Sequence, residues 1–576
     1  MKYFADIYKL FNRKYKFFTY VAFAAIAISG SLEILSIGTF WPVVQAMVGP
    51  EKFMENSIVQ KVQSVVHISG YTNFVIFMLI SIIVVFVLKN AYLVLFNVFN
   101  QRFVLGLQMD LSYRLFKNFI YSDYEFFFDK NTAEIQRDIH VTPNHAIGGF
   151  LMSGLYLAND LLMVLMFAVV GIVVDPVSTS VIIGIMAVLS LLYMLMANKI
   201  GKKSGRIARE SNKHIIKSIS QCFSSIAQVK VNGKESYFLR RFYDVYRKYV
   251  IAFRRKMIIG ALPKMVLETV SIASICLVCL VNISMGRELK ELIPVLTLYM
   301  LAFIRIMPSV NKILSNFMNM RYAEPFVETM LETMKNVKDD QTVWRTKEKT
   351  RIERALAFED ISYAYPSAPD KIVLDRISLE IPANSFIGIV GRSGSGKSTM
   401  VALLVGLLRP KMGMIKIDGK PMDADLEKWQ NNIGYIPQEI RLLDDTILSN
   451  VAYGETDPNI EKAKKALDMA QLTEFIDSLS NGLYTRVGQN GAMLSGGQKQ
   501  RIGIARALYR EAEVLVLDEA TSSLDHETAE QFTQNILNLK HTLTIISISH
   551  KVETLSECDQ VYKMQGGRLE PIQVKH

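Results

Sequence analysis

The chain has 576 residues, of which 50% are hydrophobic, and its mean hydropathy is +0.21. This length allows several domains, and this composition is unusually apolar for a soluble protein. The net charge of +11 would suit a nucleic-acid partner, but basic cytoplasmic loops give membrane proteins similar values, so we expect no nucleic acid.

The first part of the chain contains six apolar segments, each near or above the roughly 20 residues that a bilayer-spanning helix needs. Polar sequence separates the second span from the third, and the fourth from the fifth. The loop between Lys199 and Lys256 is rich in Lys and Arg. Basic loops stay in the cytoplasm, which places the N-terminus, both long loops and the C-terminal half there. The predicted spans are residues 17–47, 72–99, 147–174, 177–198, 257–284 and 290–314.

The segment between the first two spans has apolar residues near helical spacing from Phe53 to Val66. It could be an amphipathic helix at the outer surface or an ordinary loop. After the sixth span, charged sequence breaks the apolar pattern. We therefore predict a transmembrane domain over residues 1–330, a linker over 331–355 and a soluble α/β domain over 356–576.

The soluble part contains "GIVGRSGSGKSTM", which follows the apolar run "SFIGIV" and precedes the helix-like "VALLVGLL". This is the pattern G-x-x-x-x-G-K-S between a strand and a helix, which cradles phosphate with backbone N–H groups. Lys397 is expected to reach the β- and γ-phosphates of ATP, and Ser398 to bind Mg²⁺. The predicted ATP-binding residues here are Gly391, Arg392, Ser393, Gly394, Ser395, Gly396, Lys397, Ser398 and Thr399.

Two further motifs follow. In "EVLVLDEATSSLD", a buried strand ends at Asp518, which can hold the Mg²⁺ shell, and Glu519 can polarise the attacking water. In "LSGGQKQR", residues 494–501, a second anion site opens a helix, too far along the chain to cradle the same phosphates. Its residues are Ser495, Gly496 and Gly497.

These motifs together resemble those of ABC exporter half-transporters, over essentially the whole chain. The resemblance implies an α-helical membrane domain of six transmembrane helices fused to a soluble α/β P-loop ABC ATPase domain. It also implies a homodimer that sandwiches two ATP molecules with Mg²⁺. In that arrangement, Ser495, Gly496, Gly497 and Gln498 of one subunit contact the ATP bound by the other.

The same resemblance assigns the remaining ATPase residues. Tyr365 stacks on adenine, Gln438 joins Ser398 and Asp518 around the metal, Asp525 communicates between the two sites, and His550 touches the γ-phosphate. One departure is "TRVGQNG", where Gln489 replaces the usual acid, so whether the charged contact to the coupling loops is weakened stays open. Residues 121–139 and 224–242 resemble these coupling segments, although their aromatic residues could also be ordinary helix-packing residues.

Exporter architecture does not specify the cargo, so ionisable residues inside the spans are the best clue. Lys89, Lys264 and Arg305 become six bases around one cavity in a dimer, which favours a polyanionic headgroup such as pyrophosphate. Structural ion pairs with Glu33 or Glu268 are the alternative for Lys89 and Lys264.

Four stretches also resemble those of PglK-type flippases of bacterial lipid-linked oligosaccharides: "LAFIRIMPSVNKIL", "ALPKMVLETV", the part of the first span from Glu33 to Pro42, and the segment between the first two spans. The resemblance implies an inner-membrane, multi-pass flippase that moves a polyprenyl-pyrophosphate-linked oligosaccharide from the cytoplasmic to the periplasmic leaflet. Lys89, Lys264 and Arg305 would face the pyrophosphate. An exporter of a hydrophobic drug, peptide or other lipid is the alternative, and an ATP-gated channel or regulatory subunit is a third reading. The sequence does not indicate which glycan is carried.

Overall fold

The computed structural model describes residues 2–39, 42–43, 46, 50–68, 70–174, 176–284, 289–335, 346, 348–520, 533–534, 536–537, 542–550, 552 and 555–573. The chain divides into two compact units. The first unit is Met1–Ser122 together with Lys130–Gln341, and the second is Asp123–Asp129 together with Thr342–His576.

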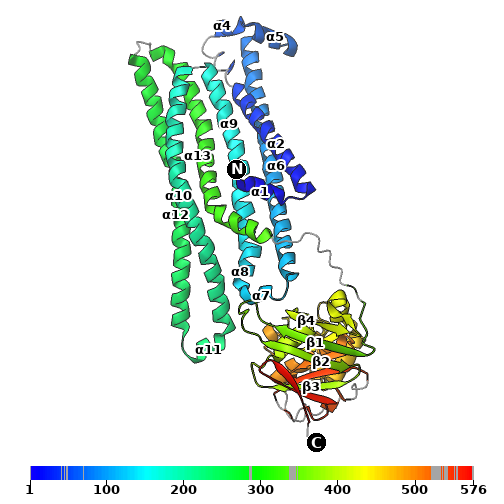
Figure 1. Ribbon diagram of the computed structural model, residues 1–576. Coiled ribbons are helices and arrows are strands. Elements are labelled where there is room, and N and C mark those ends of the chain that lie inside the picture. The colour runs from blue at the N-terminus through cyan, green and yellow to red at the C-terminus, as the bar shows by residue number, and fades with distance from the viewer. Residues whose placement is uncertain are drawn as a thin grey trace. The chain divides into compact units, whose positions relative to one another are not determined.

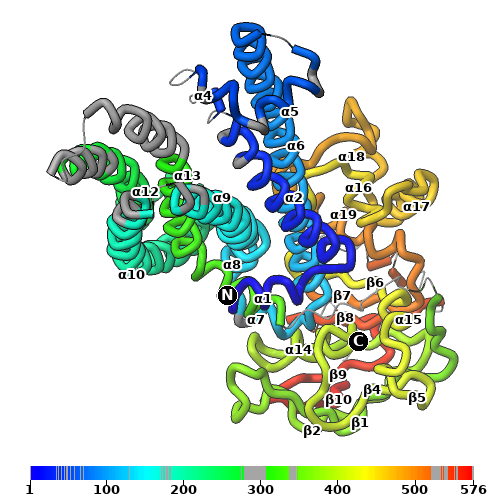
Figure 2. Tube along the Cα trace, turned by 90° about the horizontal axis from the view of Figure 1, so that it is seen from above, coloured from blue at the N-terminus to red at the C-terminus, as the bar shows by residue number. Residues whose placement is uncertain are grey.

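The first unit is entirely helical in its described part. Seen end-on, α9, α10, α12 and α13 pack together and α2 lies along α6 (Figure 2). Its helices are α1 (Lys2–Lys9), α2 (Arg13–Gly38), α4 (Pro50–Met54), α5 (Ser57–Val66), α6 (Tyr71–Ile120), α8 (Thr132–Gln136), the π-helical η1 (Arg137–Val141) and η2 (Asn144–Leu151), α9 (Met152–Val174), α10 (Pro176–Ser224), α11 (Ile226–Val231), α12 (Glu235–Ser284) and α13 (Leu289–Met334).

Four described segments are long and apolar enough to cross a membrane, namely Arg13–Glu33, Tyr71–Ile120, Thr132–Val169 and Ile183–Ser224. They overlap the first four predicted spans. The fifth and sixth predicted spans lie in α12 and α13, where many side chains are outside the described residues. The total of six spans therefore stays a prediction.

The longest helices extend well beyond the thickness of a bilayer. The 50 residues of α6 make a helix of about 75 Å, compared with about 30 Å of hydrocarbon. One face of α6 is apolar and buried over its second half, where Phe103, Leu107, Leu111 and Leu115 recur at helical spacing. They pack in one cluster with residues of α1, η2 and α13, so the helices hold each other together beyond the predicted span as well.

The second unit has two sheets (Figure 1). The smaller sheet is antiparallel with strand order β2-β1-β4-β5, and the larger one has the order β10-β9-β3-β8-β7-β6. The strands of the two sheets are β1 (Ala355–Tyr363), β2 (Leu374–Pro382), β3 (Phe386–Gly391), β4 (Met412–Ile417), β5 (Lys420–Pro421), β6 (Ile433–Ile436), β7 (Val514–Asp518), β8 (Thr544–Ser549), β9 (Gln560–Gln565) and β10 (Arg568–Ile572).

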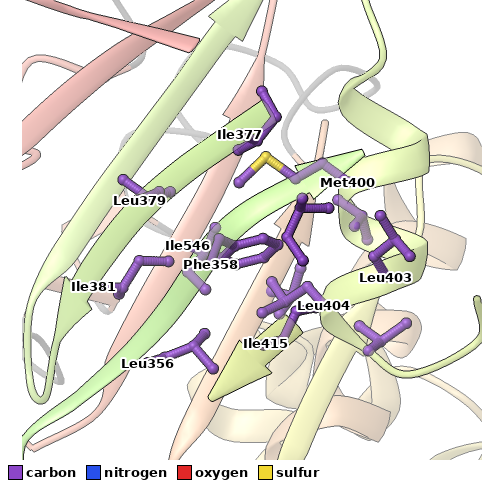
Figure 3. Packing of buried hydrophobic residues seen from close by; sticks show 14 of the residues in the cluster. Leu356, Phe358, Ile377, Leu379, Ile381, Met400, Leu403, Leu404, Ile415 and Ile546 are labelled. Carbon is purple, nitrogen blue, oxygen red and sulfur yellow. The ribbon is translucent and has the colours of Figure 1, made fainter. Parts of the chain in front are cut away.

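Helices and short turns complete this unit. They are α7 (Phe126–Asp129), α14 (Lys397–Leu404), η3 (Met422–Asp425), α15 (Leu426–Asn431), α16 (Ile447–Val451), α17 (Ile460–Met469), α18 (Thr473–Asp477), η4 (Gly482–Tyr484), η5 (Gln489–Gly491) and α19 (Gly496–Tyr509). The main core lies between the two sheets and α14. Figure 3 shows Phe358 and Ile415 of the small sheet, Ile546 of the large one and Leu404 of α14 packed against each other.

The C-terminal end of the predicted linker is bonded to this unit. The backbone N–H groups of Glu353, Arg354 and Ala355 all donate to the carboxylate of Asp418, at 2.8–3.0 Å. Residues 336–345 and 347 of the linker lie outside the described residues.

Candidate functional site

The site lies at one edge of the large sheet. Strands β6, β7, β8 and β3 are parallel, and their last residues are in register, with Val390 opposite Ser549 and Asp518 opposite Ile548. The carboxyl ends of parallel strands meet at one edge, where side chains that follow each strand converge. The register therefore brings together four motifs that are far apart in the sequence.

The loop after β3 has the backbone of an anion-binding site. Gly394 and Gly396 have φ angles of +79° and +110°, which favour glycine, and α14 begins directly after them. A Cβ atom on Gly391 would lie 2.5 Å from the backbone oxygen of Met564, so a larger residue does not fit there. The two glycine conformations and the start of α14 are those expected of a phosphate-binding loop.

Lys397 is the first residue of α14, directly after this loop. Its Nζ atom donates to the carbonyl oxygens of Gly391 and Arg392, at 2.7 and 3.1 Å. Burial lowers the pKa of Lys397, and the carboxylates of Glu519 and Asp518 oppose that shift. The ammonium group is therefore placed between the loop and two acids.

The two acids follow β7 and have different environments. Asp518 is buried, and burial raises its pKa, with a further contribution from the neighbouring Glu519. Glu519 has a φ of +54°, a left-handed conformation that non-glycine residues adopt rarely. Its N–H donates to the carbonyl of Ile548 at 3.0 Å, which holds this conformation. The turn directs the Glu519 carboxylate away from the strand and toward the site.

Gln438 and His550, which the sequence predicts at the metal and at the γ-phosphate, both contact that carboxylate. Gln438 Nε2 donates to Glu519 Oε2 at 2.7 Å, and His550 Nε2 pairs with Glu519 Oε1. The other ring nitrogen of His550, Nδ1, lies 3.1 Å from the carbonyl oxygen of Gly391. A carboxylate oriented from both sides beside a phosphate loop is suited to act as a general base on water.

The aromatic residue predicted for adenine lies beside the same helix. Tyr365 Oη is 2.9 Å from Thr399 Oγ1, in the first turn of α14. Its ring is flanked by those of Tyr363 and Phe128, the latter from the segment Asp123–Asp129 of the same unit. Part of the first predicted coupling segment therefore packs in this unit.

The residues of the "LSGGQ" motif, called the signature residues below, begin the helix α19, as predicted. Ser495 is the N-cap of α19, where its Oγ accepts from the N–H of Gln498 at 3.2 Å and its own N–H donates to Gln498 Oε1 at 2.9 Å. Ser495 and Gly496 are exposed at this helix N-terminus. Gln489 begins the short turn η5, and Asp525 lies outside the described residues.

The residues predicted to contact the cargo, Lys89, Lys264 and Arg305, lie on three different helices of the first unit. Lys89 Nζ lies 2.8 Å from Glu33 Oε2, and both side chains are buried between α2 and α6. Of the pairings that the sequence leaves open, this one forms. On α12, the side chains of Lys264 and Glu268 are both described, both exposed, and form no ion pair with each other. The Arg305 side chain is outside the described residues.

Asp160 and Lys312 are further charged residues within the predicted spans, and the sequence pattern did not assign them a role. Asp160 on α9 is 4% exposed, and it interacts electrostatically with Lys312 on α13. A residue-by-residue scan of the third and sixth spans for charge would have found both.

Comparisons with known proteins agree with this architecture. Residues 374–522 match the family model described as ABC transporter. The ATP-dependent lipid A-core flippase of Burkholderia thailandensis is 28% identical over 479 residues, which cover 80% of this chain and 77% of the relative. The ATP-dependent lipid A-core flippase of Chromobacterium violaceum is 40% identical over 215 residues, 37% of each chain.

The fold of this chain is also similar to that of a solved structure. A bacterial Atm1-family ABC exporter solved with ATP bound superposes with a TM-score of 0.76, at 20% identity, over 96% of this chain and 94% of that one. The predicted fold class is confirmed: the protein is a helical membrane domain joined to a P-loop ABC ATPase domain. It is an ATPase whose hydrolysis is coupled to transport.

Proposed function

We propose that this exporter is an ATP-driven flippase that moves a polyprenyl-pyrophosphate-linked oligosaccharide across the bacterial inner membrane, from the cytoplasmic to the periplasmic leaflet. The curated relatives are named as lipid flippases, which supports a lipid cargo. The oligosaccharide is proposed from the charges within the membrane spans. Lipid A-core, the cargo named for the relatives, is the second candidate.

The observation that carries the proposal is the excess of bases in the spans. Lys290 and Glu291 at the start of the sixth span cancel in charge. The remaining bases are Lys89, Lys264, Arg305 and Lys312, and the remaining acids are Glu33, Asp160 and Glu268.

One base per subunit is therefore in excess even after Asp160 is counted, and the ion pair of Lys89 with Glu33 does not change this difference. Burying an unmatched base in hydrocarbon is unfavourable, so a cargo that brings anionic charge explains its presence. We place Lys264 and Arg305 at the pyrophosphate. Lys89 can contribute there only if its ion pair opens.

The ATPase residues have proposed roles at the sheet edge. We infer that the loop from Gly391 to Thr399 binds the phosphates of ATP, and that Ser398, Asp518 and Gln438 hold Mg²⁺. The buried carboxylate of Asp518 and the exposed hydroxyl of Ser398 are oxygen donors of the kind that Mg²⁺ requires. When bound, the metal neutralises charge on the transferred phosphoryl group.

The signature residues then belong to the other half of a shared site. Ser495, Gly496, Gly497 and Gln498 are proposed to contact ATP held by a second copy of the chain, and Asp525 to communicate between the two sites. A homodimer supplies two such composite sites. It also gathers the intramembrane bases of both subunits around one cavity.

The test is reconstitution in proteoliposomes with a fluorescent polyprenyl-pyrophosphate oligosaccharide. Wild type should move the lipid only with ATP, Glu519→Gln should reduce ATPase activity and flipping by at least about 100-fold, and Arg305→Ala should lose flipping more than ATPase activity. The control is Lys203→Ala, which removes an exposed base outside the predicted spans.

The possible results separate the alternatives. Equal flipping by wild type and both variants would refute the proposal. Transport of lipid A-core but not of the oligosaccharide would refute the cargo while keeping the flippase. Drug-stimulated ATPase activity that is insensitive to Arg305→Ala would favour a drug exporter, and ATP-gated conductance in planar bilayers without lipid movement would favour a channel.

A further inference from the structure

The segment Asp123–Asp129, with the sequence "DYEFFFD", joins α6 to α8 in the chain but packs in the second unit. Two of its side chains contact β1 and the loop after it. Glu125 Oε1 accepts from the hydroxyl of Tyr363 at 2.8 Å, and the ring of Phe128 lies 5.4 Å from that of Tyr365 at an interplanar angle of 74°. One contact is polar and the other is aromatic.

These contacts leave the Tyr365 ring little freedom. The edge of Phe128 packs on one side, and Tyr363 makes a second edge-to-face contact at 5.2 Å and 87°. The Tyr365 hydroxyl is held by Thr399 Oγ1 at 2.9 Å. A tyrosine ring is oriented by two side-chain torsions, so two ring contacts and one hydrogen bond suffice to fix its plane.

Glu125 holds the second of the flanking rings. Tyr363 is 1% exposed, and burial together with the Glu125 carboxylate raises the pKa of its hydroxyl. A buried hydroxyl needs a partner, and Glu125 supplies it from the same segment as Phe128. The segment thus fixes Tyr365 directly through Phe128 and indirectly through Tyr363.

We propose that Phe128 is a positioning residue for the nucleotide base, and that it acts by setting the plane of Tyr365 for stacking. This rests on the proposed role of Tyr365 in adenine binding. Stacking depends on the relative orientation of the two rings, so a Tyr365 ring that rotates freely binds the base less well. The affinity of the site for adenine then depends on the position of the segment Asp123–Asp129. By the same coupling, binding of adenine stabilises that position of the segment.

The test measures ATPase kinetics of the full-length protein in lipid nanodiscs. Phe128→Ala should raise the KM for ATP by about 2- to 10-fold, the range expected for one aromatic pair, and leave kcat within about twofold. The matched control is Phe127→Ala, because the Phe127 ring packs against Phe126 within the segment. Phe127→Ala should leave the KM unchanged.

A second readout separates positioning from a loss of structure. Tripolyphosphate competes for the phosphate loop but carries no base, so its inhibition constant should be the same in wild type and Phe128→Ala. Where Phe128→Ala folds poorly, Phe128→Leu keeps an apolar side chain without the aromatic edge and should show the same KM shift. An equal change for ATP and tripolyphosphate, or an unchanged KM, would overturn the proposal.

Tyr365→Ala completes the test. It should raise the KM for ATP by itself, and adding Phe128→Ala should raise it no further, because the two residues act through one ring. If the two effects multiply, Phe128 does not act through Tyr365 and the inference is wrong. If Tyr365→Ala leaves the KM unchanged, the assignment of adenine to Tyr365 fails as well, and the two failures are distinguishable.

Discussion

The buried pair of Glu33 and Lys89 shows how single residues in this membrane domain depend on each other. Each side chain is at most 5% exposed, and their charged atoms are 2.8 Å apart. Lys89 also lies over the ring of Phe86, at 4.9 Å from its centroid. A buried charge is tolerated when it is paired, so removing one member should be worse than removing both.

Lys89→Ala should therefore lower the free energy of unfolding by about 3–5 kcal/mol, because the Glu33 carboxylate stays buried without this cation. The double change Glu33→Leu with Lys89→Leu should lie much closer to wild type. The measurement is unfolding in detergent followed by fluorescence, with Lys203→Ala as a surface control expected within about 0.5 kcal/mol. A double variant less stable than Lys89→Ala would contradict this account.

At this scale the sequence indicated which ATPase motifs lie close together, but it did not indicate which partners the membrane charges have. The phosphate loop, Asp518–Glu519 and His550 each follow a strand in the same local pattern, so the strand order of one sheet is enough to bring them together. Whether Lys89 pairs with Glu33 depends on how α2 packs on α6. The sequence of either helix alone does not determine which residues face each other. The left-handed backbone of Glu519 also has no sequence signal, since it is imposed by neighbouring strands.

The proline in α12 shows how two helices are joined at the level of elements. Pro263 has no N–H, so the carbonyl of Ile259, four residues earlier, loses its helical donor. Tyr193 of α10 donates its hydroxyl to that carbonyl at 3.1 Å, and both residues are buried. An apolar pocket of about 240 Å³ lies beside this contact, lined by residues of α10, α12 and α13 that include Tyr193, Pro263 and Leu314.

Because of this contact, the effects of substituting Tyr193 and Pro263 on the free energy of unfolding should not be additive. Tyr193→Phe should cost about 1–3 kcal/mol of stability, because it leaves the Ile259 carbonyl buried without its donor. In the background of Pro263→Ala the same change should cost much less, because the new N–H at position 263 can bond that carbonyl. Unfolding of the four variants in detergent measures the difference, and equal costs in both backgrounds would refute the explanation.

The sequence predicted the elements in outline. The helices α6 and α10 run well past the second and fourth predicted spans, so the polar sequence that follows each of these spans continues the helix. The π-helical segments Arg137–Val141 and Asn144–Leu151 were not predicted, because their residues fit an ordinary helical pattern. The first predicted span runs to residue 47, whereas α2 ends at Gly38. Hydropathy alone gives no stop signal there.

For the whole molecule, the proposed homodimer makes a prediction about mixed subunits. Lys397→Ala disables the phosphate loop of a subunit, and Ser495→Arg disables its signature helix, so each variant alone should be inactive. In a mixed dimer both defects fall in one composite site and the other site is intact. Purification through two different tags leaves only mixed dimers, so up to about one half of the sites should recover.

The measurement is ATPase activity after the two variants are co-expressed with different affinity tags and purified through both. A mixture as inactive as its parents would show that phosphate loop and signature act within one subunit. The control is co-expression of Lys397→Ala with itself under both tags, which should recover nothing.

The ion pair between α2 and α6 has a consequence for how the protein is made. The ribosome delivers Glu33 before Lys89 exists, and a charged residue at the centre of a helix costs about 2.5–3.5 kcal/mol on insertion scales. We expect α2 to remain beside the insertion machinery until α6 emerges, so that the two helices enter the lipid together. The order of synthesis and the pairing of charges would then set the first step of assembly, before the ATPase domain has been translated.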